Sequence, residues 1–291
     1  MLDMYADFTA HHIQLGTHIE LLEMCDLQKR VEAVQETEVK SKLAETRRIF
    51  EISKDSPSEP LAKAPSTEAL AWSARVACGL DRMVEDFNLD GLTYYYRGVD
   101  NNDYEKLGAG LILGNSLLTG GGVPCAGEGD LKTCFTMYMM DILGVGGSYT
   151  EFYAMDLNGQ FMLMAHDGPG HLAISDRKPI LRGLGLFHGK SGSGISVEFN
   201  VKTGPVTILG LTQTADGRLK LIAAEGGSIP GPILRIGNTN SRIKFRKPPP
   251  EFLADWTSHG PIHHVALGIG HVFSQIECAA KLLGLELVRV G

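Results

Sequence analysis

The chain has 291 residues, of which 43% are hydrophobic, so it is long enough for one large domain or two ordinary ones with a sizeable core. Its formal net charge is −7 and no basic block stands out, which argues against nucleic acid as a partner. No apolar run approaches the length needed to span a membrane, and the first residues carry an acid rather than the basic and apolar regions of a secretion signal.

Five cysteines are scattered singly along the chain, at positions 25, 78, 125, 134 and 278. Their number is odd and none forms a CxxC pair, which suits a reducing cytoplasm better than a disulfide framework. We therefore expect a cytoplasmic protein whose ligands are small molecules, neutral or bound to a metal.

Residues 1–144 are predicted to alternate between helix and strand. Helices are predicted at about residues 19–31, 38–52, 67–87 and 104–118, and a short aromatic strand at 92–96. The first helix is expected to begin at a capping box formed by Thr17 and Glu20. This alternation indicates an open α/β, Rossmann-like domain over residues 1–144, whose ligands gather at strand ends.

From residue 145 onward the pattern changes to short strands. They are predicted at residues 148–157, 160–166, 195–202, 206–214, 218–224 and 242–246, with a final helix at 272–283 and a strand at 285–290. The dipeptides Asn158-Gly159 and Asp216-Gly217 are strong hairpin signals. We therefore predict a C-terminal antiparallel β-barrel domain with flanking helices over residues 145–291.

A glutamate between two glycines marks the entrance of a predicted helix. Glu128 lies between Gly127 and Gly129, where a glycine-rich turn gives way to an amphipathic run that ends at Ile142. Glycine allows backbone conformations that crowd other residues, so the carboxylate can be presented at the helix entrance with open space before it. Taken alone, this pattern favours a capped helix with a surface acid.

Glu151 and His166 lie on the two arms of the first predicted hairpin, each seven residues from its turn. With a two-residue loop these positions pair directly and their side chains share a face, and the alternative is a solvated cross-strand ion pair. His263 and His264 are adjacent, so in an extended segment they point to opposite sides and at most one of them binds the same metal.

Two glutamates and two histidines suit one divalent ion, with Mn²⁺ favoured and Co²⁺, Mg²⁺ or Zn²⁺ behind it. A metal that holds a carbonyl oxygen and a neighbouring hydroxyl lowers the cost of an enediolate, and two flanking carboxylates can serve as base and acid. The set therefore predicts aldose–ketose isomerisation, with a metal hydrolase as an alternative that these residues do not exclude. Asp156, Asp167 and His171 lie near the hairpin and are candidates for supporting the ligands.

The chain resembles the L-arabinose isomerase family, and more distantly L-fucose isomerase. The resemblance is strongest in Gly127-Glu128-Gly129-Asp130-Leu131-Lys132-Thr133, in Gly146-Gly147-Ser148-Tyr149-Thr150-Glu151 and in the doublet His263-His264. It implies that Mn²⁺ is held by Glu128, Glu151, His166 and His264. It also implies that the two glutamates move the proton between C1 and C2 and that Tyr96 lines the sugar site. We further expect Tyr149 and His263 to contact the sugar.

The resemblance implies an α/β middle domain followed by a C-terminal domain with an antiparallel barrel. The sequence begins where the family's middle domain begins, so we expect a chain without the family's N-terminal domain, either a fragment or a minimal form. Without that domain the site would be open to water, and an enediolate needs shelter from side reactions, so we expect a homo-oligomer with the site near a subunit interface. The implied reaction is L-arabinose to L-ribulose, D-galactose to D-tagatose or a related isomerisation. The alternative is a non-catalytic sugar-binding or regulatory relative that keeps the fold and metal site.

Overall fold

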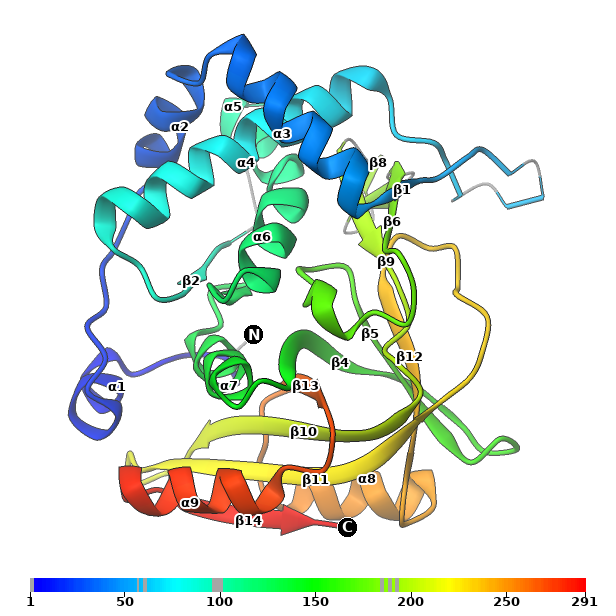
Figure 1. Ribbon diagram of the computed structural model, residues 1–291. Coiled ribbons are helices and arrows are strands. Elements are labelled where there is room, and N and C mark those ends of the chain that lie inside the picture. Colours follow the sequence, from blue (N-terminus) through cyan, green and yellow to red (C-terminus); the bar gives the residue numbers. More distant parts are fainter. Residues whose placement is uncertain are drawn as a thin grey trace.

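The computed structural model describes residues 3–56, 58–59, 62–95, 102–183, 186–187, 190–191 and 194–291. Its helices are α1 (Phe8–Leu15), α2 (Met24–Glu32), α3 (Glu36–Ile49), α4 (Thr67–Phe87), α5 (Asp103–Ala109), α6 (Leu111–Gly120), α7 (Leu131–Ile142), α8 (Pro249–Ser258) and α9 (Phe273–Leu283), with a 3₁₀ turn η1 (Leu172–Ile174). Its strands are β1 (Glu51–Ile52), β2 (Leu92–Thr93), β3 (Cys125–Ala126), β4 (Gly146–Asp156), β5 (Phe161–His166), β6 (Ile180–Gly183), β7 (Leu186–Phe187), β8 (Lys190–Ser191), β9 (Ile195–Glu198), β10 (Gly204–Gln213), β11 (Leu219–Ile229), β12 (Thr239–Phe245), β13 (His264–Ile269) and β14 (Glu286–Val290). Figure 1 shows α2 to α6 gathered at one end, the long strands at the other, and α7 between them.

The described part of residues 1–144 is mostly helical, so the open α/β sheet expected there is not found. Its strands are only two residues long: β2 pairs in parallel with β3, and β1 pairs with β6 from the second half of the chain. Part of the apolar surface of this half is buried between helices, because α4 packs against α2, α3 and α6. The result is a mixed α/β protein whose first half is a helical layer.

One predicted helix has the expected limits, and two others begin or end at different residues. The helix predicted at 67–87 is confirmed as α4, with Ser66 as its N-cap. The capping box predicted at Thr17 is wrong, since Glu23 and Asp26 form the box that starts α2. The helix predicted at 104–118 is divided at Gly110, where a Cβ would stand 2.7 Å from the side chain of Val76 in α4.

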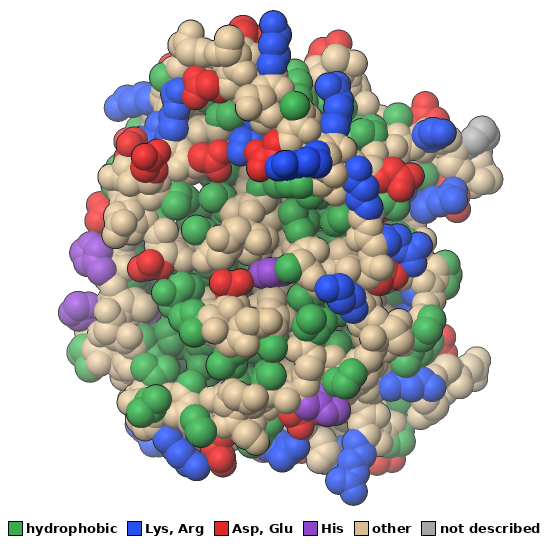
Figure 2. All heavy atoms as spheres, in the orientation of Figure 1, with side chains coloured by type: hydrophobic (Ala, Val, Ile, Leu, Met, Phe, Trp, Pro, Cys, Tyr) green, Lys and Arg blue, Asp and Glu red, His purple; other side chains and the backbone are tan. Residues whose placement is uncertain are grey.

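Charged residues on the helical layer are paired across α3 and α4. Lys42 lies 2.9 Å from Asp81, and Arg82 lies 2.7 Å from Glu38. Figure 2 shows lysines and arginines interspersed with acids over this end of the molecule. Among the described residues, no helix is both long enough and apolar enough to cross a membrane.

The second half is built on a seven-stranded mixed sheet in the order β10-β13-β4-β5-β12-β11-β14. Strand β10 also pairs with β11, so the antiparallel pairings from β10 through β13, β4, β5, β12 and β11 return to β10. Strand β14 lies beside β11 in parallel orientation, which the prediction of antiparallel strands did not include. Helix α8 was also not predicted. It begins at Pro249, a position where the missing N–H costs no helical hydrogen bond.

Two core clusters join the halves of the chain. One packs Phe50 and Leu113 against residues of the large sheet such as Ile208. The other packs Met137 and Met140 of α7 against a different set of residues of the same sheet. Both clusters contain residues from before and after position 144, and the second one packs helix α7 against the strands. The predicted domain boundary at 144/145 remains a prediction.

Gly147 of β4 lies directly against α7. A Cβ at Gly147 would stand 2.7 Å from the carbonyl oxygen of Met137, and its φ is +140°. We expect Gly147→Ala to lower the free energy of unfolding by roughly 2–4 kcal/mol, because overpacking adds to a strained backbone. The matched control is Gly144→Ala, which has φ +72° but nothing within 4 Å. Its expected cost is about 1 kcal/mol. Urea unfolding measures both, and equal losses would contradict the proposed clash with α7.

Candidate active site

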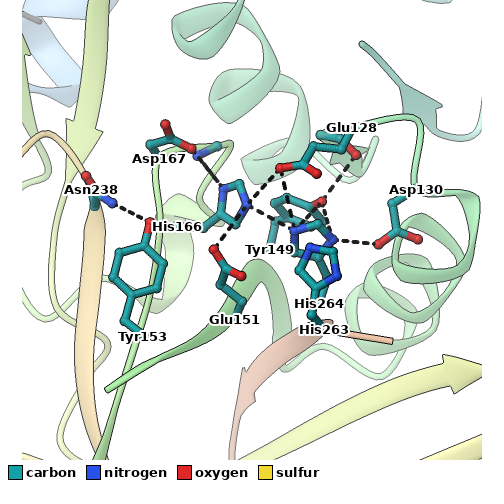
Figure 3. A network of polar contacts seen from close by, with 12 residues as sticks. Glu128, Asp130, Tyr149, Glu151, Tyr153, His166, Asp167, Asn238, His263 and His264 are labelled. Carbon is teal, nitrogen blue, oxygen red and sulfur yellow. Dashed lines mark hydrogen bonds and ion pairs between the residues drawn. The ribbon is translucent and has the colours of Figure 1, made fainter. Parts of the chain in front are cut away.

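Three adjacent strands and one turn bring the predicted ligands together (Figure 3). Glu151 in β4 pairs with His264 at the start of β13, and His166 ends the neighbouring strand β5. Glu128 comes from the turn between β3 and α7. Residues up to 136 positions apart in the sequence, from Glu128 to His264, therefore point toward one place.

The hairpin of β4 and β5 departs from the predicted register by one residue. Near the turn Asp156 pairs with Phe161 as predicted, but an irregularity between Phe152 and Ala154 shifts the ladder, and Glu151 pairs with Ala165. A bulge of this kind adds one residue to one strand. The predicted direct pairing of Glu151 with His166 is therefore wrong, although Oε1 of Glu151 still lies 4.0 Å from Nε2 of His166.

The donor atoms of the four side chains form a close set. Nε2 of His166 lies 3.2 Å from Nε2 of His264, and Oε1 of Glu128 lies 4.0 Å from each of these nitrogens. The ligand atoms of Glu151, His166 and His264 all lie within 4.8 Å of one another, so these three side chains suit a single divalent ion. Glu128 faces the same place, with Oε1 at 4.0 Å from both imidazole nitrogens.

In this group of four side chains the two histidines are buried, and the two glutamates form an edge that solvent can reach. The side chains of His264 and His166 are 0% and 5% exposed, whereas those of Glu128 and Glu151 are 14% and 28% exposed. Burial raises the pKa of the Glu151 carboxyl above its ordinary value, against the opposing influence of His264 and His263. A carboxylate with a raised pKa is a stronger base, which suits proton transfer from carbon.

The raised pKa of Glu151 also affects stability in the metal-free protein. Because the folded-state pKa lies above the unfolded value, this carboxylate lowers stability above its folded pKa and has no such effect below its unfolded pKa. We expect Glu151→Gln to raise the Tm at pH 8 in EDTA, and the gain to shrink as the pH falls toward about 4. Calorimetry at both pH values tests this, and a Tm at pH 8 no higher than that of the wild type would contradict it.

Glu128 is held in a left-handed turn. Its φ is +59° and that of Gly129 is +72°, while the N–H of Asp130 donates to the carbonyl of Gly127 at 3.0 Å. Positive φ at both central positions defines a type I′ turn. A non-glycine residue is strained in this conformation, and such strain is typical of residues held for function. The turn aims the Glu128 carboxylate at the two imidazoles.

Asp130 orients His264, a role that the sequence analysis missed. Asp130 is fully buried and is the N-cap of α7: its Oδ1 accepts the N–H of Thr133 at 2.9 Å. Its Oδ2 lies 3.0 Å from Nδ1 of His264. Because a carboxylate only accepts, Nδ1 carries the ring proton and Nε2 keeps a lone pair facing His166. Carboxylate–histidine pairs of this kind orient metal ligands. The available signal was an aspartate directly before a helix, which by itself indicates only a cap.

In His166 the ring proton lies on Nε2, the nitrogen that faces the other predicted ligands. The N–H of Gly168 donates to Nδ1 of His166 at 2.8 Å, so the proton is on Nε2 and is directed at His264. A metal ligand that uses Nε2 carries its proton on Nδ1 instead, and Oδ1 of Asp167 lies 3.3 Å from that nitrogen. Metal binding and the position of this proton are therefore coupled.

Tyr149 and His263, two of the residues expected to contact the sugar, have different surroundings. Tyr149 is fully buried, its ring lies 4.4 Å from both imidazole rings, and its hydroxyl donates to the carbonyl of Gly127. The side chain of His263 is 38% exposed. The third, Tyr96, lies outside the described residues.

The two adjacent histidines do not diverge. Their ring centroids are 3.9 Å apart, because β13 begins only at His264 and His263 lies in the bend before it. The expectation based on an extended segment is therefore wrong. One ring nitrogen of His263 lies within 4.8 Å of donor atoms of Glu128 and His264, so these three form an alternative ligand group.

Of the supporting candidates, only Asp167 contacts one of the four predicted ligands. Oδ1 of Asp156 accepts the N–H of Gly159 at 2.6 Å and so stabilises the hairpin turn. Nε2 of His171 lies 2.8 Å from Oδ1 of Asp141 near the far end of α7. These two residues therefore support the elements around the site rather than its ligands.

Comparison with known proteins identifies relatives of this chain. Residues 5–146 match the family described as the L-arabinose isomerase central domain. The chain is 25% identical to the L-arabinose isomerase of Acidothermus cellulolyticus and 24% identical to that of Herpetosiphon aurantiacus, over 96% of its own length and 55% of theirs. It is 23% identical to that of Geobacillus thermodenitrificans, over 98% of the chain and 57% of the relative. The chain therefore spans somewhat more than half the length of the curated relatives that it matches.

Proposed function

This chain is related to the L-arabinose isomerases, and we propose that it is a metal-dependent aldose–ketose isomerase. The convergence of two carboxylates and two imidazoles, from Glu128, Glu151, His166 and His264, is the observation that carries the proposal. The proposed reaction is L-arabinose to L-ribulose, D-galactose to D-tagatose, or that of a related aldose.

We propose Mn²⁺ as the ion, with Co²⁺ or Mg²⁺ as alternatives, because the donor set mixes hard oxygens with imidazole nitrogens. The four residues named above would hold it. When bound, the ion supplies positive charge beside the carbonyl oxygen and so lowers the cost of the enediolate.

The chain's own carboxylates carry the proton. Glu151, whose pKa is raised by burial, is suited to take a proton from carbon, and Glu128 faces it from another element as the second acid or base. One carboxylate removes the proton at C2 and a carboxylic acid returns one at C1, while the hydroxyl proton on O2 passes to O1, so that the C1 aldehyde becomes a hydroxyl and C2 becomes the ketone. Asp130 keeps His264 oriented throughout. His263, Tyr149 and Tyr96 are the proposed contacts to the sugar.

The domain organisation and the cellular compartment are part of the same proposal. The closed circuit of antiparallel pairings supports a C-terminal barrel domain that begins near residue 145. The five cysteines are all free, which supports a reducing cytoplasm.

An enediol also needs shelter from water. We therefore propose a homo-oligomer in which a second copy covers the site, and light scattering that gives a monomer of 31.5 kDa with full activity would contradict this.

Incubation of the purified chain with Mn²⁺ and a panel of aldoses, followed by a ketose assay, tests the proposed function. We expect ketose to form, EDTA to abolish its formation, and Mn²⁺ to restore it. Calorimetric titration with Mn²⁺ and with each sugar is run in parallel. Binding of metal and sugar without any ketose would assign the chain to the alternative class, a non-catalytic sugar-binding relative.

A further inference from the structure

The segment that contains Asp3 and α1 is tied to α7 and to the turn between β10 and β11. The carbonyl of Asp3 accepts a hydrogen bond from Nζ of Lys132, in the first turn of α7, at 2.8 Å. Farther along, Nε2 of Gln14 donates to the carbonyl of Gly217, and Oε1 of Gln14 accepts the N–H of Leu219. The backbone of Asp3 is thus held against the helix that follows the Glu128 turn.

The carboxylate of Asp3 binds His263 at two points. Its Oδ2 accepts the backbone N–H of His263 at 3.0 Å and lies 2.7 Å from Nδ1 of the same residue. A backbone N–H only donates, so Oδ2 acts as an acceptor, and Nδ1 must supply the proton of the second hydrogen bond. In the neutral ring this leaves Nε2 with a lone pair, because the hydrogen bond made at one ring nitrogen decides which nitrogen carries the proton.

His263 differs from the neighbouring ligands in its access to solvent. Its side chain is 38% exposed, whereas that of His264 is fully buried. One of its ring nitrogens is nevertheless within 4.8 Å of donor atoms of Glu128 and His264. A hydrogen-bond acceptor at the accessible edge of a carboxylate and imidazole set suits a hydroxyl group that arrives from solvent.

We propose that Asp3 is a positioning residue, which holds His263 in the Nδ1–H tautomer so that Nε2 accepts a hydroxyl of the sugar. The identity of the ligand rests on the proposed function, but the tautomer does not. A purely structural role, in which Asp3 only ties its segment down, predicts the same tautomer but no dependence of KM on this carboxylate.

The tautomer is tested by ¹⁵N NMR of the histidine rings at pH 8, in the full chain with and without Mg²⁺, which is diamagnetic. We expect Nδ1–H for His263 in the wild type, Nε2–H in Asp3→Ala, and retention of Nδ1–H in Asp3→Asn, whose amide oxygen still accepts. Asp7→Ala is the matched control, because the Asp7 carboxylate lies in the same segment and caps α1. A wild-type Nε2–H tautomer, or an equal change in Asp7→Ala, would overturn the proposal.

The sugar-facing role is tested by kinetics and by metal titration. Loss of one oriented hydrogen bond corresponds to roughly tenfold in binding, so Asp3→Ala is expected to raise KM about tenfold with little change in kcat. Its affinity for Mg²⁺ should equal that of the wild type. A shift of the His263 Nε2 signal on addition of Mg²⁺ would make His263 a metal ligand and overturn this role. A chain with the expected tautomer but no isomerase activity would refute the proposed function and leave the Asp3–His263 assignment standing.

Discussion

Replacement of Glu128 or Glu151 by glutamine is expected to lower turnover by at least about 10²-fold, since loss of a positioned acid or base typically costs about 10²–10⁴-fold. Glutamine keeps the size of the side chain but cannot take a proton from C2 or return one to C1. The two carboxylates approach the set from a turn and from a strand, so neither replaces the other. The double mutant should be little worse than the worse single one, because the two residues act as a unit.

A steady-state ketose assay with calorimetric Mn²⁺ titration on each variant measures this. Glu225→Gln is a suitable control, because Glu225 is a strand glutamate with a side chain 17% exposed, and it forms an ion pair with Arg289 rather than with the site. Turnover within about threefold of the wild type, with metal still bound, would remove that glutamate from the mechanism. Such a result would favour the sugar-binding alternative.

Asp130→Asn is expected to weaken binding of Mn²⁺ by about 10–100-fold, the usual effect of losing a partner behind a metal-binding histidine. The asparagine oxygen can still accept the N–H of Thr133 and cap α7. In place of Oδ2, however, its amide group donates to Nδ1 of His264 and puts the ring proton on Nε2, the nitrogen that faces the ligand set. The substitution therefore separates the two roles of this buried residue.

Asp130→Ala is the companion variant, because it removes the cap as well as the acceptor. We expect Asp130→Asn to keep nearly the wild-type free energy of unfolding in EDTA, and Asp130→Ala to lose at least about 1 kcal/mol, the typical cost of a lost N-cap. Both variants should bind Mn²⁺ weakly. Unchanged metal affinity in Asp130→Asn would show that His264 does not need this carboxylate.

Features that depend on residues close together in the chain could be predicted from the sequence. Helix α4 was predicted with its correct limits, because its apolar spacing and its cap lie within one segment. The hairpin signals at Asn158-Gly159 and Asp216-Gly217 mark real turns between antiparallel strands. The chemical types of the candidate ligands also follow from motifs, since Glu128 and the His263-His264 doublet each stand in a local pattern.

How these parts meet depends on contacts between residues far apart in the sequence, which form only in the folded protein. One bulge between Phe152 and Ala154 moved the partner of Glu151 by one residue, because register depends on packing against both neighbouring strands and not on the turn alone. The carboxylates that orient the two histidines are also distant in sequence: Asp130 is 134 residues from His264, and Asp3 is 260 residues from His263. No periodicity or local motif records such a contact, because the hydrogen bond exists only after the core has brought α7, β13 and the segment before α1 together.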